Sequence, residues 1–167
     1  MRQRLSLLAL VGLAAFPLLG QTPVSPRNWE RHPAIREIRA LVAQIDSLPL
    51  VEQADSADCG RGYIGITARL FTDSAGRARK YLLAGGSDDS AGEARLYFDA
   101  TGQLRFRFST TNAVNGTRQE DRFYYDAQGR ELYHDRRRLA GPGYNDIWDV
   151  PAGINPVTDF HNLCGPG

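Results

Sequence analysis

The side chains best suited to acid–base chemistry in this chain are its three histidines, His32, His134 and His161. Asp159 lies two residues before His161, and Asp135 directly follows His134. General acid–base catalysis needs a histidine beside a carboxylate or nucleophile in a cleft. The sequence contains neither a Gly-x-Ser-x-Gly elbow nor a His-Glu-x-x-His zinc helix. The catalytic candidates are therefore His161, Asp159 and His134, as parts of a small hydrolase, and no metal or cofactor is expected.

Arginine supplies the other chemically suggestive cluster. Arg95, Arg105 and Arg107 fall on the polar face of one predicted hairpin together with Tyr97, and the inferred register places Arg95 opposite Arg107. Like charges that face each other destabilise a strand pair unless they are compensated. One interpretation is pairing with acidic neighbours, for which the candidates are Glu93, Glu120 and Asp121. The other is binding of an anionic ligand or an acidic partner surface, which suits the planar guanidinium.

The elements that would position these residues are alternating strands separated by a recurring turn. The turns are Asp73–Gly76, Asp99–Gly102 and Asp126–Gly129, spaced by 26 and 27 residues. Asp at the first position bonds forward to the backbone, and Gly at the fourth accepts a positive φ, which predicts type I turns with a bulge. The predicted strands are Tyr63–Phe71, Arg77–Ala84, Glu93–Phe98, Gln103–Thr110, Arg118–Tyr125 and Arg130–Arg137.

The central turn also predicts a register. With Asp99 opposite Gln103, Phe98 faces Leu104, and the pairs Leu96–Phe106 and Ala94–Phe108 follow on the same apolar face. A slip of one residue would mix apolar with charged side chains, so the pattern favours this register.

One of these turns has a known counterpart. The run Tyr124-Tyr125-Asp126-Ala127-Gln128-Gly129-Arg130-Glu131-Leu132 resembles the YD repeat of RHS-type bacterial surface and toxin proteins. The stretch from Leu96 to Leu104 is a looser match, and the resemblance covers Leu70 to Arg137 only. YD repeats form shells in long arrays. Because three units are too few for a shell, the resemblance implies local hairpins and not the encapsulating role.

A single helix precedes the strands. Pro33 suits a first helical turn, the pattern ends by Pro49, and the apolar positions recur at helical spacing; they are Ile35, Ile38, Leu41, Val42 and Ile45. The fold expected is α+β and mostly β, with one N-terminal amphipathic helix packed across the apolar face of an antiparallel meander of about six strands. Apolar residues on both faces of the third hairpin suggest that the C-terminal tail covers it.

The N-terminus reads as an export signal. Arg2 and Arg4 precede the uncharged apolar run Leu5–Leu19, which is too short to span a bilayer. We expect residues 1–20 to be a signal peptide, 21–27 a flexible leader and 28–167 a single exported domain. The chain carries 20 basic and 19 acidic residues, and removing the signal leaves 18 and 19. This near-neutral balance argues against nucleic-acid binding.

Export gives the two cysteines a structural interpretation. In an oxidising compartment, Cys59 and Cys164 are expected to form one disulfide that ties down the Gly/Pro-rich tail. The periplasm or the extracellular space is the expected location, with no membrane association after cleavage. The favoured function is non-catalytic binding of a protein or anionic polymer through Arg95, Arg105, Arg107 and Tyr97. The alternatives are a small secreted hydrolase and a purely structural envelope protein.

Overall fold

The computed structural model describes residues 22–60, 63–145, 148 and 150–164. The expected signal peptide, residues 1–20, lies outside them. Within the expected leader, Val24 packs against an aromatic cluster of the domain, and the Ser25 amide donates to the Asn28 side chain at 2.8 Å. A short 3-10 turn, η1 (Trp29–Arg31), follows.

The predicted helix is confirmed as α1 (Pro33–Ser47). His32 caps it, because Nδ1 accepts from the amide of Ala34 at 3.3 Å. Its Nε2 lies 2.8 Å from the carbonyl oxygen of Thr22. Both ring nitrogens of this buried histidine are therefore engaged, which gives His32 a structural role. The buried stripe of α1 consists of Ile35, Ile38 and Ile45.

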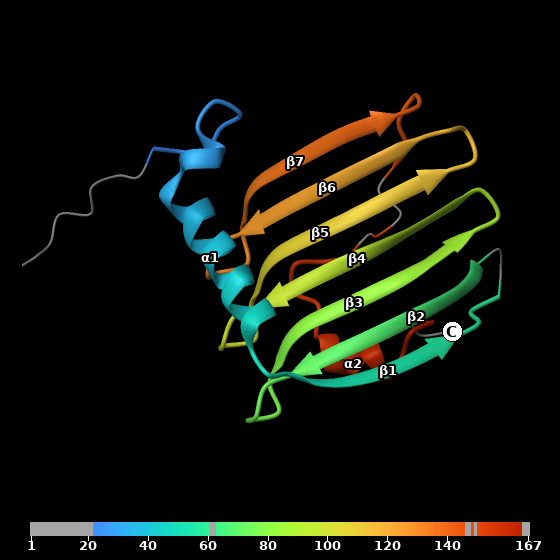
Figure 1. The fold of residues 1–167 in the computed structure, drawn as a ribbon, viewed down its shortest axis with the longest axis horizontal. Coiled ribbons are helices and arrows are strands. Elements are labelled where there is room, and N and C mark those ends of the chain that lie inside the picture. The colour runs from blue at the N-terminus through green and yellow to red at the C-terminus, as the bar shows by residue number, and fades with distance from the viewer. Residues whose placement is uncertain (1–21, 61–62, 146–147, 149, 165–167) are drawn as a thin grey trace, which may run out of the picture.

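The rest of the fold is one antiparallel sheet whose seven strands lie in sequence order (Figure 1). The strands are β1 (Val51–Ala57), β2 (Tyr63–Thr72), β3 (Ala78–Ser87), β4 (Ser90–Phe98), β5 (Leu104–Ala113), β6 (Arg118–Tyr125) and β7 (Glu131–Ala140). The α+β class and the meander are confirmed, with seven strands where about six were predicted. The additional strand is β1. Val51 is its one large aliphatic residue, and the strand lies exposed at the sheet edge, so no alternation marks it in the sequence.

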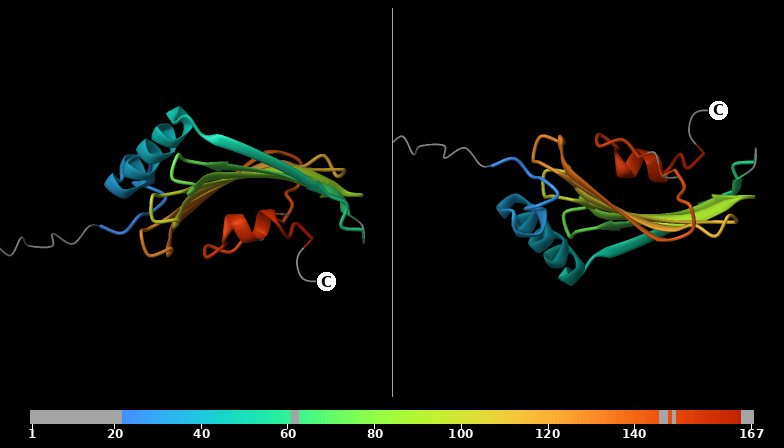
Figure 2. Two further views of the ribbon diagram at one scale, coloured as in Figure 1. Left: turned by 90° about the horizontal axis from the view of Figure 1, so that it is seen from below. Right: turned by 90° about the horizontal axis from the view of Figure 1, so that it is seen from above.

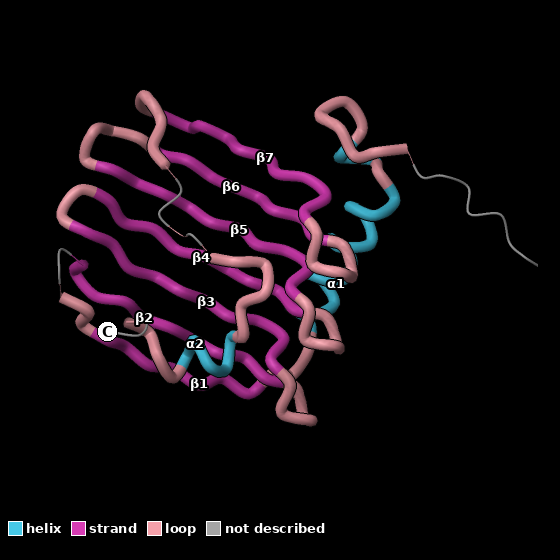
Figure 3. Tube along the Cα trace, turned by 180° about the vertical axis from the view of Figure 1, so that it is seen from behind, coloured by secondary structure: helices cyan, strands magenta, loops and turns pink. Residues whose placement is uncertain are grey.

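Different segments cover the two faces of the curved sheet (Figure 2). We call the face that carries α1 the helix face. The opposite, concave face carries α2 (Pro156–Phe160) and the rest of the C-terminal tail, and we call it the tail face (Figure 3). The main core lies on the tail face, and its buried residues are Ala68, Leu70, Tyr81, Leu83, Ala94, Leu96, Phe98, Leu104, Tyr125 and Phe160. A smaller cluster joins α1 to the helix face through Trp29, Ile35, Ile38 and Tyr124. The tail, and not the helix as expected, therefore covers the main apolar face.

The three repeated turns have the predicted geometry. In the central one, the Asp99 carboxylate accepts the amides of Thr101 and Gln103 at 2.9 and 3.1 Å. Gly102 has a φ of 85°, which lies in the left-handed region that favours glycine. Asp73 and Asp126 make the same pair of contacts in their turns.

The predicted register beyond the central turn is wrong by one residue. Phe98 pairs with Leu104 as expected, but a bulge follows, and Tyr97 rather than Leu96 pairs with Phe106. The extra residue is Arg105. Because side chains alternate between faces along a strand, one inserted residue exchanges the two faces of β5.

The predicted disulfide is confirmed, because Cys59 and Cys164 are bonded. Cys59 follows β1 at one edge of the sheet, and Cys164 ends the described part of the tail. The bridge therefore fixes the far end of a tail that leaves the sheet at β7 and crosses the tail face (Figure 3).

Candidate functional site

The structure does not bring the expected arginine cluster together. Arg95 pairs with Phe108, and Arg107 pairs with Leu96, so the prediction that Arg95 faces Arg107 is wrong. The cause is the bulge at Arg105, which moves each following side chain of β5 to the opposite face of the sheet. Arg95 lies on the helix face, whereas Arg107 lies on the tail face.

Each of these arginines has local partners. Arg95 forms an ion pair with Glu93 and stacks its guanidinium 5.7 Å from the ring centroid of Phe108. Arg105 donates to the carbonyl oxygen of Tyr125 at 3.2 Å and to Asp99 at 3.3 Å. The pairing with acidic neighbours that the sequence offered as one interpretation therefore holds for Arg95.

Arg107 is 4% exposed. Its guanidinium lies 3.9 Å from the ring centroid of Phe123 and donates to the carbonyl oxygen of Trp148 in the tail. This arginine therefore joins the sheet to the tail that covers it.

Tyr97 connects β4 to α1. It is 5% exposed, and its ring centroid lies 5.9 Å from that of Phe106. Its hydroxyl donates to Asp46 at 3.4 Å, and burial raises the pKa of Tyr97. Ligand binding by Arg95, Arg105, Arg107 and Tyr97 stays a prediction, and the structure divides these residues between the two faces.

No hydrogen bond or ion pair joins the side chains of the expected pair Asp159 and His161 among the described residues, and only the His161 amide donates to the Asp159 carbonyl oxygen. Asp159, on α2, accepts instead from the Tyr81 hydroxyl at 2.8 Å. Burial and this carboxylate together raise the pKa of Tyr81. His161 is exposed at the end of α2, with its ring edge-on to Phe160.

His134 has a carboxylate partner that the sequence did not identify. Its Nε2 lies 2.6 Å from Asp121 on β6, whereas the adjacent Asp135 lies on the opposite face and bonds to Arg137 at 3.2 Å. The register explains the contact, because Asp121 is paired with Arg136 and lies diagonally across from His134. Pairing the strands from the third turn without a bulge would have placed Asp135 opposite Asp121, so the contact depends on the bulge at Leu132.

Asp121 is the centre of a polar cluster on the tail face. The residue is 1% exposed, and it accepts from Arg136 Nε at 2.7 Å and from Gln119 Nε2 at 2.9 Å in addition to His134. Burial opposes ionisation, but these donors outweigh it and hold the pKa of Asp121 below its ordinary value. The buried carboxylate is therefore charged and fixes the Arg136 side chain.

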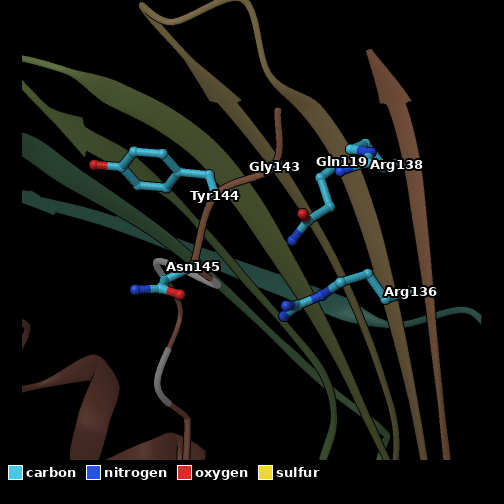
Figure 4. A pocket seen from close by; sticks show the side chains of 6 residues that line it. All are labelled: Gln119, Arg136, Arg138, Gly143, Tyr144 and Asn145. Atoms are coloured by element: carbon cyan, nitrogen blue, oxygen red, sulfur yellow. The ribbon is translucent and has the colours of Figure 1, made fainter. Parts of the chain in front are cut away.

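An open pocket of about 860 Å³ lies beside this cluster (Figure 4). Gln119 and Arg136 extend into it from the sheet, and the tail forms the facing wall. Its lining residues are Gln119, Arg136, Arg138, Gly143, Tyr144 and Asn145. The wall is held in place, because the Tyr144 hydroxyl donates to Asp89 at 2.6 Å.

The pocket is suited to a negatively charged group. Arg136 is held through Nε by Asp121, and its two Nη groups have no hydrogen-bond partner among the described residues. Arg138 bonds through Nη1 to the carbonyl oxygen of Pro142 at 2.8 Å. Both side chains remain accessible, so two cations face the pocket beside the Gln119 amide. We call these residues the Arg136–Arg138 pocket.

Comparison with models of known protein families, with curated proteins and with solved structures finds no match for this chain. The YD-repeat resemblance therefore stays a prediction about local sequence. The described residues contain no group of three or more His, Cys, Asp or Glu side chains that could hold a metal ion. No helix in the described ranges is long and apolar enough to cross a membrane.

Proposed function

We propose that this protein is an exported, non-catalytic binding protein that captures anionic groups of a partner in the Arg136–Arg138 pocket. The apolar run Leu5–Leu19 and the Cys59–Cys164 disulfide support export to an oxidising compartment. The proposal retains the expected class of function, namely binding by arginines on a sheet face. It assigns that binding to arginines of β7.

The observation that carries the proposal is the anchoring of Arg136 by buried Asp121. A surface arginine loses side-chain entropy when it binds a ligand, which offsets much of the interaction. Here the fold already restricts the guanidinium, and its two Nη groups have no hydrogen-bond partner among the described residues. The fork geometry then suits a carboxylate or phosphate oxygen pair.

Retention of the purified mature protein on carboxymethyl dextran, with neutral dextran as reference, tests the proposal. We expect binding that weakens with salt and an affinity about tenfold lower for Arg138→Gln, equivalent to about 1.4 kcal/mol. Arg137→Gln is the matched control, because Arg137 lies on the helix face of the same strand and pairs with Asp135. Equal retention of the Arg138→Gln and parent proteins overturns the proposal.

A second candidate function rests on the 2.6 Å contact between His134 and Asp121. A carboxylate that holds one ring nitrogen of a histidine leaves the other nitrogen to act as a base, as a small hydrolase would require. A screen of the mature protein with activated esters and phosphoesters tests it. Turnover that disappears in His134→Ala but persists in His161→Ala supports this candidate, and turnover that survives both changes removes it.

A further inference from the structure

The Gln119 side chain has a fixed orientation beside Arg136. Its Nε2 donates to Oδ2 of Asp121 at 2.9 Å, and Arg136 Nε donates to Oδ1 of the same carboxylate at 2.7 Å. Because an ionised carboxylate only accepts hydrogen bonds, the nitrogen of the Gln119 amide and not its oxygen must face Asp121. The buried carboxylate therefore sets both the guanidinium and the amide in place.

This orientation leaves a hydrogen-bond acceptor in the pocket. Gln119 is 3% exposed, and its side chain extends into the pocket beside that of Arg136 (Figure 4). With Nε2 bonded to Asp121, the amide oxygen Oε1 has no hydrogen-bond partner among the described residues. Polar groups of buried side chains normally have a partner. The Gln119 oxygen is therefore available to a donor group of a ligand.

Arg136 and Gln119 thus present opposite hydrogen-bonding character. The Nη groups of Arg136 are donors without a partner among the described residues, whereas Gln119 Oε1 is an acceptor. A ligand that satisfies both carries acceptor oxygens and a donor close together. A carboxylate with a hydroxyl on the neighbouring carbon has this pattern. A sulfate ion has acceptors only, so it would set an oxygen against the Gln119 oxygen.

The charges of the pocket favour a ligand group with a single negative charge. Asp121 compensates Arg136, whereas Arg138 bonds to the carbonyl oxygen of Pro142 and to no described carboxylate. Of the two arginines that line the described part of the pocket, one is therefore uncompensated. A carboxylate matches this charge, and a dianion exceeds it.

We infer that the ligand of the Arg136–Arg138 pocket is a sugar acid, whose carboxylate binds the two arginines and whose adjacent hydroxyl donates to Gln119. This inference rests on the proposed function and specifies its ligand class. The described lining contains no aliphatic side chain, although binding pockets for organic groups are usually lined mostly by apolar side chains. A sugar ring suits this polar lining, because its other hydroxyls can bond to groups such as the Asn145 amide.

Holding Asp121 in place does not by itself require glutamine at position 119. A lysine has similar length and also donates to a carboxylate. If Gln119 served only as this donor, a hydroxyl on the ligand would have no effect on binding. The deciding measurement is therefore the preference for a ligand that carries the hydroxyl over one that lacks it.

The test is an NMR titration of the isotope-labelled mature protein with small probes. Methyl glucuronoside and its 4-deoxy analogue differ only in the hydroxyl next to the carbon that bears the carboxylate. Methyl glucoside lacks the carboxylate. N-acetylglycine carries an amide N–H beside its carboxylate, as the end of a polypeptide does. Carboxymethyl dextran reports anion capture by the pocket independently of the hydroxyl.

We expect methyl glucuronoside to bind about fivefold more tightly than its 4-deoxy analogue, as one hydrogen bond implies, and methyl glucoside not to bind. Gln119→Met is expected to abolish this preference, whereas Gln128→Met, in an exposed turn, keeps it. Arg138→Gln should weaken both glucuronosides about tenfold and leave their ratio unchanged. Circular dichroism checks the fold of each variant. Gln119→Lys, which retains a donor to Asp121, is a second variant expected to lose the preference.

Three outcomes overturn the inference. Equal affinities of the two glucuronosides, or a preference that survives Gln119→Lys, show that Gln119 accepts no hydroxyl; Arg138-dependent binding of carboxymethyl dextran then leaves the proposed function standing. Tighter, Gln119-dependent binding of N-acetylglycine assigns the pocket to a polypeptide terminus. If no carboxylate probe binds, the proposed function fails together with the inference.

Discussion

Arg79 and Arg105 lie at the same position of consecutive hairpins, and each donates from Nε to a backbone carbonyl of the next hairpin. The acceptors, Phe98 and Tyr125, each precede the aspartate of the next turn. Both arginines are the extra residue of a bulge. The third hairpin has Leu132 at this position, and β7 is the last described strand of the sheet. Arginine is therefore present only where a further hairpin supplies an acceptor.

Replacing Arg79 or Arg105 with Ala is expected to lower the free energy of unfolding by about 1.5 kcal/mol, because each change leaves a carbonyl without its charged donor. Urea denaturation measures the loss. Arg77→Ala is the control, since the Arg77 side chain is 54% exposed in its ion pair with Asp73, and we expect a change below about 0.5 kcal/mol. An equal loss of unfolding free energy for Arg77→Ala and Arg105→Ala would contradict a stabilising role for the hydrogen bond from Arg105 to the next hairpin.

Asp121→Asn is expected to lower the free energy of unfolding at pH 7 by about 2 kcal/mol, because it removes a buried acceptor of three donors. The pKa of Asp121 is lower in the folded state than in the unfolded chain. Its contribution is therefore complete above about pH 4 and disappears as the pH falls through the folded-state pKa. Urea denaturation between neutral and acidic pH should show this dependence in the parent protein and a smaller one in Asp121→Asn. Glu120→Gln, on the opposite face of β6, should keep it.

Loss of the Cys59–Cys164 bond is expected to lower the free energy of unfolding by about 4 kcal/mol, since it closes a long loop in the unfolded chain. Guanidinium denaturation of the double Cys→Ala variant measures this effect. Mass analysis of alkylated, exported protein under non-reducing conditions checks the bond itself. Two free thiols in that sample would contradict the assignment.

Gly85→Ala is expected to cost about 2 kcal/mol, because the new Cβ would lie 2.6 Å from the carbonyl oxygen of Gly65 on β2. The neighbouring strand would have to move. Gly153→Ala is the matched control, since no heavy atom of the other described residues, apart from its chain neighbours, lies within 4 Å of its added Cβ. Thermal denaturation of the two variants should separate them by several degrees, and coincident midpoints would refute the close approach.

Local chemistry explains which features the sequence predicts. The Asp99–Gly102 turn, the α1 boundaries and the Cys59–Cys164 bond each depend on residue types within a short stretch or on a single possible pairing. The bulge at Arg105 recurs at Arg79 and Leu132, the same position of the other two hairpins, but the apolar alternation around the central turn favours the pairing without a bulge and so conceals it. Missing this bulge also gave a wrong position for Arg107, because one inserted residue moves its side chain to the other face of the sheet.

The candidate site was harder to predict from the sequence, because it depends on contacts between strands and between the sheet and the tail. His134 was identified, but its partner was sought beside it in the chain and not across the sheet, where Asp121 lies. Arg136 and Arg138 resemble ordinary exposed arginines until the buried carboxylate and the tail wall are seen. β1 was missed because an exposed edge strand needs no apolar alternation.

The position of the disulfide also determines how the molecule responds to mechanical force. A meander ordinarily unzips one strand at a time when it is pulled from its ends. Here β2 to β7 and the described tail lie between Cys59 and Cys164, so they form one covalent ring. Tension applied at the two ends of the chain passes through the sulfur–sulfur bond and can extend only the segments outside the ring, including α1 and β1. The pocket on β7 would keep its shape under a load that strips the N-terminal helix away.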